Sequence, residues 1–305
     1  MSTTLIFRRT VRMAIGRIDE RRHVHHEIIA ALRFEPLALA VSHPDLATYL
    51  DFACRIAVDA GTAILPHFRS ALAVDDKGRA GVYDPVTEAD RAAETTIREA
   101  IVRAYPDHGI RGEEHGWRKG TSSYTWVIDP IDGTRSFIIG QLHWGTLIAL
   151  NDGVRPVVGV MHQPYVGETF TGIRGGVAQW RRGELRRALS TRPCATLSEA
   201  RLACTHPEMF QHEAERCAFE RIAAKVCLTR FGGDCYQYCL LAAGLIDIVI
   251  ESSLEAYDVQ ALMPIVDAAG GVMTSWTGGP CDEGGAVVAC GDSTLHQRVL
   301  ELLAQ

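Results

Sequence analysis

Apolar and polar positions follow two different patterns along this chain, and the pattern changes near residue 190. Between residues 43 and 105, apolar residues recur every three or four positions, which predicts two amphipathic helices. The first should begin at Ser42 and Pro44. The second should follow Thr87 and Asp90, which have capping-box spacing, and stop before Pro106. Their apolar faces consist of Leu46, Leu50, Ala53, Ala57, Ala60 and Ile64, and of Ala93, Ile97, Ile101 and Ala104.

The region from residue 109 to about 190 contains short apolar runs that are typical of strands. One run covers residues 109–114 and ends in the paired acids Glu113 and Glu114. Two others cover residues 143–150 and 154–160, and Asn151-Asp152-Gly153 between them is a strong hairpin signal. Further strand material continues to Trp180. The first half is therefore predicted to be two helices against a largely antiparallel sheet.

The second half, residues 191–305, alternates strand-like and helix-like segments. This alternation predicts a mixed α/β sheet with helices on its faces. The expected strands are 200–205, 226–231, 246–250, 272–274 and 286–289, and the expected helices are 208–225, 234–243, 256–269 and 294–303. The fold class is thus α/β with α+β character, and we expect one domain over residues 41–305.

Residues 1–40 have a different composition, in which arginines, acids and histidines are mixed without a core pattern. The acids argue against a transit peptide, and the apolar run is too short for a signal peptide. We expect this segment to be an extension outside the fold. A second polar segment, Lys77-Gly78-Arg79-Ala80-Gly81, reads as a simple basic turn.

Composition and charge exclude some classes of function. The chain has 305 residues, 47% of them hydrophobic, which is enough for a sizeable core. A net charge of −6 argues against a nucleic-acid partner, and no apolar run approaches the roughly 20 residues of a membrane span. The nine cysteines are odd in number and scattered, without a C-x-x-C pair, so we expect a reducing, cytoplasmic setting.

The most informative stretch runs from Tyr124 to Thr134. A buried-strand composition leads to Asp129, Pro130 should end the strand, and Asp132 follows in the turn before Gly133 and Thr134. Carboxylates at a strand end beside free helix N-terminal amides can hold a divalent cation and a phosphate together. A turn with two solvated acids explains this segment equally well.

Three more acids occupy strand ends or helix starts, and they favour the first interpretation. These are Asp90, Glu113 and Asp258. Capping alone explains Asp90 and Asp258. Five such acids in one chain, beside a Gly-Thr helix start, are harder to explain by capping. Signatures of a P-loop, a nucleophile elbow and an H-E-x-x-H zinc site do not occur in the sequence.

Four motifs in order give the chain a family resemblance. They are Asp84-Pro85-Val86-Thr87 through Asp90, Gly112-Glu113-Glu114, Asp129 to Thr134, and Tyr257-Asp258 with Ala268-Ala269-Gly270-Gly271. Over roughly residues 43 to 303 the chain resembles the inositol monophosphatase family. The resemblance implies a layered αβαβα sandwich, a magnesium-dependent phosphomonoesterase and a homodimer. Tyr257 is a departure, since many members have Trp there, and it bears on packing beside the site.

The resemblance also implies a ligand set for two or three Mg²⁺ ions. Glu113, Asp129 and the Ile131 carbonyl would hold one ion, and Asp129, Asp132 and Asp258 a second, while Glu114 supports the loop or a water-mediated third ion. Oxygen ligands alone suit such a hard cation. The catalytic residues would be Asp90, Thr134 and Glu113, with the Thr134 hydroxyl paired to Asp90 and orienting the attacking water. The amides of Gly133 and Thr134 would bind the phosphate.

Within the family, three segments resemble the histidinol-phosphate phosphatase branch: residues 129–137, 230–236 and 243–247. This implies hydrolysis of L-histidinol phosphate to L-histidinol and phosphate, in histidine biosynthesis. The substrate residues would be Asp234, Glu251 and Asp258, because an ammonium and an imidazole call for carboxylates. The alternative is an inositol-1-monophosphatase or a small-molecule phosphatase of broad specificity. A remote alternative is a member of the fold that lacks catalysis and acts by binding.

Overall fold

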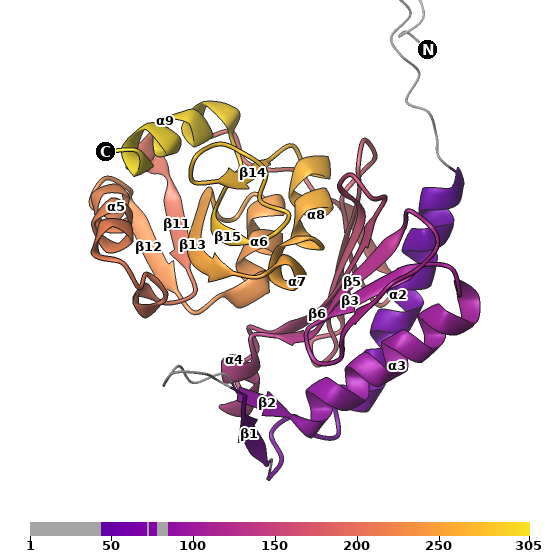
Figure 1. Ribbon diagram of the computed structural model, residues 1–305. Coiled ribbons are helices and arrows are strands. Elements are labelled where there is room, and N and C mark those ends of the chain that lie inside the picture. Colours follow the sequence, from indigo (N-terminus) through magenta and orange to yellow (C-terminus); the bar gives the residue numbers. More distant parts are fainter. Residues whose placement is uncertain (1–43, 72, 78–84) are drawn as a thin grey trace, which may run out of the picture. The chain divides into compact units, whose positions relative to one another are not determined.

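Two long helices cover one face of the larger of two main sheets. The computed structural model describes residues 44–71, 73–77 and 85–305, so the extension predicted over residues 1–40 and the Asp84 motif position lie outside the described residues. Helices α2 (Pro44–Ile64) and α3 (Glu88–Ala104) pack on each other and on strands β5, β6 and β7 (Figure 1). Both predicted helices are confirmed. Most of the two predicted apolar faces is buried, with Ala53, Ala57, Ala60 and Ile64 among the residues without solvent exposure, but Leu50 is half-buried and Ala104, the last residue of α3, is exposed.

The larger sheet is almost entirely antiparallel, as the alternating runs predict. Its order is β10-β9-β8-β7-β6-β5-β3-β4, and only the pairing of β3 with β5 is parallel. Its strands are β3 (Gly109–Gly112), β4 (Gly116–Arg118), β5 (Thr125–Asp132), β6 (Gly145–Asn151), β7 (Pro156–Gln163), β8 (Glu168–Ile173), β9 (Gln179–Arg182) and β10 (Leu185–Ala188). The predicted hairpin joins β6 to β7, and the Asn151 Oδ1 atom accepts a 2.8 Å hydrogen bond from the Gly153 amide. A separate small sheet pairs β1 (Val74–Asp76) with β2 (Pro85–Thr87).

The second main sheet carries helices on both faces. Its order is β12-β11-β13-β15-β14, with parallel pairing from β12 through β11 to β13 and antiparallel pairing beyond. The strands are β11 (Arg201–Cys204), β12 (Leu228–Phe231), β13 (Ile248–Leu254), β14 (Val272–Ser275) and β15 (Gly285–Cys290). The helices are α5 (Glu213–Ala223), α6 (Asp234–Ala242), α7 (Ala256–Val259), α8 (Leu262–Ala268) and α9 (Ser293–Leu303), with single 3₁₀ turns at Leu197–Glu199 and Pro207–Met209.

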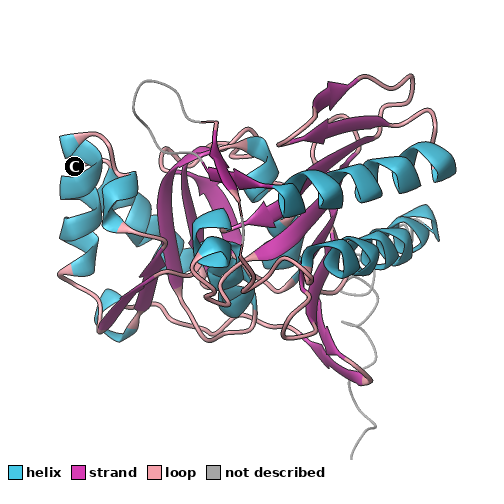
Figure 2. Cartoon of the chain, turned by 90° about the horizontal axis from the view of Figure 1, so that it is seen from below, coloured by secondary structure: helices cyan, strands magenta, loops and turns pink. Residues whose placement is uncertain are grey.

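The helices of the second half form two layers, which completes the αβαβα sandwich. Helices α6 and α8 lie between the sheets, where α8 contacts β7 and β8 as well as β14 (Figure 1). Helices α5 and α9 pack on each other, and α9 contacts β15. The second view shows the two long helices running along the larger sheet, away from the C-terminal helix (Figure 2). The predicted layered fold is confirmed.

Several element boundaries differ from the sequence prediction, and the structure gives a physical reason for three of them. Strand β5 continues through Pro130 to Asp132, because its pairing with β6 shifts register between Asp129 and Asp132 and then resumes. The expected helix 256–269 is two helices, since Pro264 has no N–H to donate and fits the first turn of a new helix, α8. The expected helix 208–225 begins only at Glu213, after the buried Phe210 packs its ring 4.8 Å from that of Phe219.

Candidate active site

Three of the predicted acids converge where the two sheets' elements meet. Asp129 and Asp132 come from the end of β5, and Asp258 comes from the first turn of α7, which packs on β5. One carboxylate oxygen from each lies within 4.8 Å of the others. In a regular strand, residues three apart point to opposite faces, but an irregular register re-aims a side chain. The irregularity at Pro130 therefore brings Asp129 and Asp132 together.

Backbone amides orient the three carboxylates. The Asp129 Oδ1 atom accepts from the Ile131 amide at 3.0 Å, and the Asp132 Oδ2 atom accepts from the Cys235 amide at 2.6 Å, at the start of α6. The Asp258 Oδ2 atom accepts from the Glu255 amide at 2.7 Å, within a capping box. These bonds fix the acids in place before any ligand arrives.

The acids repel one another strongly in the absence of a cation. Burial, followed by the charges of Glu113, Asp132 and Asp258, raises the pKa of Asp129 well above its ordinary value. Burial likewise raises the pKa of Asp132 well above its ordinary value and that of Asp258 to about 7. A bound divalent cation reverses this situation, because it favours the ionised carboxylates.

Glu113 and Glu114 lie in the turn after β3, and both bind a lysine. The Lys77 Nζ atom donates to Glu113 Oε1 at 2.8 Å and to Glu114 Oε1 at 2.6 Å. The sequence predicted only a simple turn here and missed that Lys77 forms ion pairs with both acids, since sequence alone does not show which acids a basic loop will contact. Glu113 adds to the charge that Asp129 experiences, but it is not part of the three-residue group.

Asp90 and Thr134 do not form the predicted pair. The Asp90 Oδ2 atom accepts from the Thr87 amide at 2.8 Å, as the capping box requires, and also from the Thr87 hydroxyl at 2.5 Å. The Thr134 hydroxyl donates instead to the Ile131 carbonyl at 3.0 Å, the carbonyl that was predicted as a metal ligand. Within the described part of the chain, Asp90 Oδ1 is buried and has no hydrogen-bond partner.

The Gly-Thr step begins helix α4 (Thr134–Ile138), as predicted. Gly133 is its N-cap residue at φ 84°, a conformation that favours glycine, and a Cβ here would lie 2.6 Å from the His143 carbonyl oxygen. Because α4 has only five residues, its dipole is weak. Phosphate binding by the Gly133 and Thr134 amides stays a prediction.

A cavity of about 1160 Å³ adjoins the three-acid group, and it is rich in further acids. Its lining includes Asp132 and Asp258, four more acids, and the cations Lys77 and Arg135. The four additional acids, here called the cavity acids, are Glu208, Asp234, Glu251 and Glu255.

The two predicted substrate residues among the cavity acids differ in how they are held. Asp234 adopts φ 42°, which is uncommon for a residue other than glycine, and its Oδ2 atom accepts from the Ser136 hydroxyl at 2.9 Å. Glu251 is buried and accepts from the Thr205 amide, the Gln237 side-chain amide and the Tyr238 hydroxyl, at 2.9, 2.6 and 2.8 Å. Burial raises the pKa of Asp234 to about 6 and that of Glu251 to about 7.

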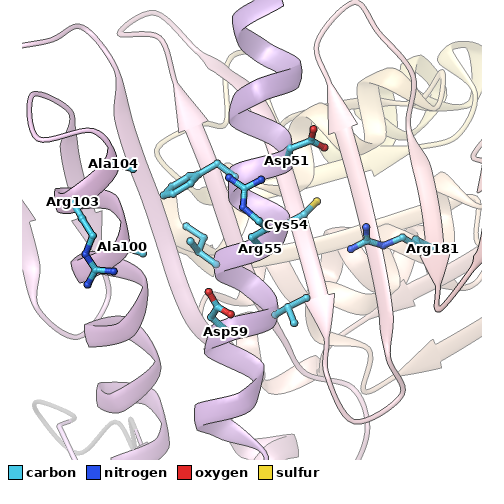
Figure 3. Close-up of a pocket in the computed structure, with 11 residues that line it drawn as sticks. Asp51, Cys54, Arg55, Asp59, Ala100, Arg103, Ala104 and Arg181 are labelled. Carbon is cyan, nitrogen blue, oxygen red and sulfur yellow. The ribbon is translucent and has the colours of Figure 1, made fainter.

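A second cavity, of about 530 Å³, lies along the outer side of α2 (Figure 3). Arg55, Arg103 and Arg181 line it together with Asp51 and Asp59. The two carboxylates are eight residues apart on α2, which corresponds to about 12 Å along a helix. They cannot share a small ion, so this cavity does not compete as a metal site.

The donor set of the three-acid group fits a hard divalent cation. All its ligand atoms are carboxylate oxygens, as such ions prefer, and histidine and cysteine do not belong to it. No helix in the described ranges is long and apolar enough to cross a membrane.

Comparison with known proteins agrees with the motifs. Residues 45–305 match the inositol monophosphatase family. A curated relative from Arabidopsis thaliana, bifunctional phosphatase IMPL2, is 42% identical over 255 residues, covering 80% of this chain and 71% of its own. A histidinol-phosphatase from Mycobacterium tuberculosis is 37% identical over 72% of this chain and 84% of its own. A solved inositol monophosphatase from Zymomonas mobilis is 38% identical at a TM-score of 0.75, covering 85% and 98% of the two chains.

Proposed function

The chain belongs to the inositol monophosphatase family, and from this premise we propose that it hydrolyses L-histidinol phosphate to L-histidinol and phosphate with Mg²⁺. Membership of the family makes it a phosphatase that acts on phosphate esters of small molecules. The choice of substrate draws support from the histidinol-phosphatases among its relatives and from the cavity beside the three-acid group.

The acidity of the cavity is the observation that carries this choice. The four cavity acids line it in addition to Asp132 and Asp258. L-Histidinol phosphate carries an ammonium group and an imidazole, both of which can donate hydrogen bonds to carboxylates. An inositol phosphate is uncharged apart from its phosphate, so it has no cationic group that could pair with the surplus carboxylates. The surplus therefore favours the cationic substrate.

In this proposal the residues have distinct roles. Asp129, Asp132, Asp258, Glu113 and the Ile131 carbonyl would hold the ions. When bound, the cations neutralise phosphate charge and lower the pKa of a water.

The remaining predicted residues would act on the phosphate and the water. The amides of Gly133 and Thr134 would donate to the phosphate oxygens. Asp90 and Thr134 would orient the attacking water, with the free Asp90 Oδ1 atom as an acceptor for its proton.

Asp234 is the better placed of the two substrate acids for direct contact. A carboxylate offers about four acceptor positions, and Asp234 uses one of them on Ser136. Glu251 already uses three on groups of the protein, which hold it rigidly at the cavity wall. We therefore expect Asp234 to bind the ammonium group and Glu251 to contribute one remaining acceptor position.

Two variants test the substrate assignment. Asp234→Asn and Glu251→Gln should lower turnover of histidinol phosphate about ten- to a hundredfold, because a hydrogen bond to a charged group contributes roughly 1.5–3 kcal/mol. Both should largely spare p-nitrophenyl phosphate. Glu184→Gln, at an exposed turn outside the cavity, is the matched control. Equal losses on the two substrates would contradict the assignment.

An inositol-1-monophosphatase or a phosphatase of broad specificity is the second candidate, favoured by the solved relative from Zymomonas mobilis. Phosphate release from histidinol phosphate, inositol 1-phosphate and simple esters, with Mg²⁺ and with EDTA, separates these possibilities. A preference of the wild-type enzyme for inositol 1-phosphate would leave only the phosphatase activity standing. Homodimer formation also remains a prediction, which sedimentation velocity can test.

A further inference from the structure

In the described part of the chain, two charged side chains outside the predicted site have no solvent exposure, Glu94 and Asp247. Glu94 lies on α3, on the same face as Asp90 and Ile97, and has no solvent exposure. An ionised carboxylate in such a place is costly unless charged or hydrogen-bonding partners surround it. Its partners therefore indicate what it does.

The Glu94 carboxylate binds the backbone of the turn that carries the paired acids. Its Oε2 atom accepts from the Glu114 amide at 2.7 Å, and its Oε1 atom accepts from the His115 amide at 3.1 Å. Arg98, one turn further along α3, donates from Nε to Glu94 Oε1 at 2.6 Å. Arg98 also donates to the Gly116 carbonyl. Glu94 and Arg98 thus hold the turn between β3 and β4 from one helix.

The turn lies directly against this carboxylate. Gly112 ends strand β3, and a Cβ atom at this position would lie 2.0 Å from Glu94 Oε1. Even a methyl group at residue 112 would therefore displace the carboxylate. The absence of a side chain at Gly112 is what allows Glu94 to reach the amides beyond it.

We propose that Glu94 is a positioning residue for the metal site, which it serves by fixing the turn that holds Glu113. This inference rests on the proposed metal-dependent function. Glu113 directly follows Gly112 in this turn, so the position of its carboxylate depends on how the turn is held. Two hydrogen bonds from the Glu114 and His115 amides to the buried Glu94 carboxylate hold the turn in place. Outer partners of this kind typically change metal affinity by about 10- to 100-fold.

The test compares Glu94→Gln with variants on the same helix. Glutamine keeps the shape but lacks the charge, and its NH₂ group would face amide or guanidinium donors. Glu99→Gln, exposed on α3, is the matched charge control, and Ile101→Val is a control for lost packing. For each metal-stripped protein, hydrogen exchange of residues 113–116, the melting temperature and Mg²⁺ binding by calorimetry are measured.

The proposal predicts a particular combination of results. Glu94→Gln should exchange its residue 113–116 amides at least tenfold faster and bind Mg²⁺ 10- to 100-fold more weakly, while both controls keep wild-type affinity. Gly112→Ala should show the same losses, and adding it to Glu94→Ala should cause little further loss. This second pair of variants decides the matter if Glu94→Gln does not fold.

Two other outcomes overturn different statements. Wild-type Mg²⁺ affinity in Glu94→Gln, or an equal loss in Ile101→Val, would show that Glu94 serves only the fold. A wild-type protein that binds no Mg²⁺ would instead refute the metal-dependent function itself.

Discussion

Replacing Asp258 by asparagine should make the metal-free protein more stable. The asparagine oxygen can still accept from the Glu255 amide, so the cap of α7 is kept. What the change removes is a negative charge next to Asp129 and Asp132. The variant therefore isolates the energetic cost of placing this negative charge in a buried, acidic site.

The pKa of Asp258 sets the size of the effect. Burial raises this pKa from 3.8 to about 7. Each unit of the rise in pKa corresponds to about 1.4 kcal/mol of stability lost when the group is ionised. The largest destabilisation that ionised Asp258 could cause is thus about 4 kcal/mol. Because Asp258 is only half-buried, water in the cavity screens part of this, and we expect about 2 kcal/mol at pH 8, or roughly 5 °C in melting temperature.

The pH dependence has a definite sign. The folded-state pKa of Asp258 is raised, so its contribution to stability is fully present below pH 3.8 and is lost as pH rises through about 7. Asparagine does not titrate. The stability difference between variant and wild type should therefore be largest at pH 8 and should vanish towards pH 4. Taking this difference removes titrations that do not depend on Asp258, such as that of His162, whose pKa burial lowers to about 4.

The assay is urea denaturation of both proteins in EDTA at several pH values, repeated with Mg²⁺. With Mg²⁺ the order should reverse, because an ion bound at 100 times its Kd stabilises wild type by about 2.7 kcal/mol. Asp59→Asn, exposed on α2, is the control and should change neither series. If Asp258→Asn is less stable than wild type in EDTA at pH 8, the buried charge of Asp258 does not destabilise the metal-free protein and this reasoning is wrong.

Three further predictions concern other parts of the chain. Asp129→Asn should abolish phosphate release at saturating Mg²⁺ with an unchanged circular dichroism spectrum, and near-normal turnover would refute its role as bridging ligand. A chain starting at Ala40 should keep its fold and activity, since residues 1–40 carry no motif; lost solubility in sedimentation would show otherwise. Thr87→Val should lower the free energy of unfolding by about 1 kcal/mol through loss of the α3 cap, measured by urea denaturation.

Local patterns predicted the elements of this fold well because their causes are local. The helical spacing of apolar residues gave α2 and α3, and the Asn-Asp-Gly turn gave the hairpin of β6 and β7. The five-layer arrangement came instead from resemblance, since periodicity does not say which faces will meet. Strand β5 illustrates the limit: Pro130 is a local stop signal, but pairing of Asp132 with Gly145 carries the strand past it.

The site was predicted as a set of residues, but their interactions were not. Lys77 and Glu94 bind the turn of Glu113 and Glu114 from two different elements, and sequence spacing contains no information about such contacts. Glu94 did leave a signal. It is a charged residue four positions after Asp90 and three before Ile97, on the stripe that the periodicity assigns to the core.

Capping and ligand binding are not alternatives for Asp90 and Asp258, although from sequence alone they compete. Each is the third residue of its helix, and each uses its Oδ2 atom for the cap. A carboxylate has two oxygens, so the cap fixes the side chain and leaves Oδ1 available. In Asp90 that atom is buried and unpartnered within the described residues, and in Asp258 the carboxylate reaches the group formed with Asp129 and Asp132. A helix start thus provides a carboxylate that is oriented through one oxygen and has the other oxygen available. Such a carboxylate can bind a cation or orient an attacking water.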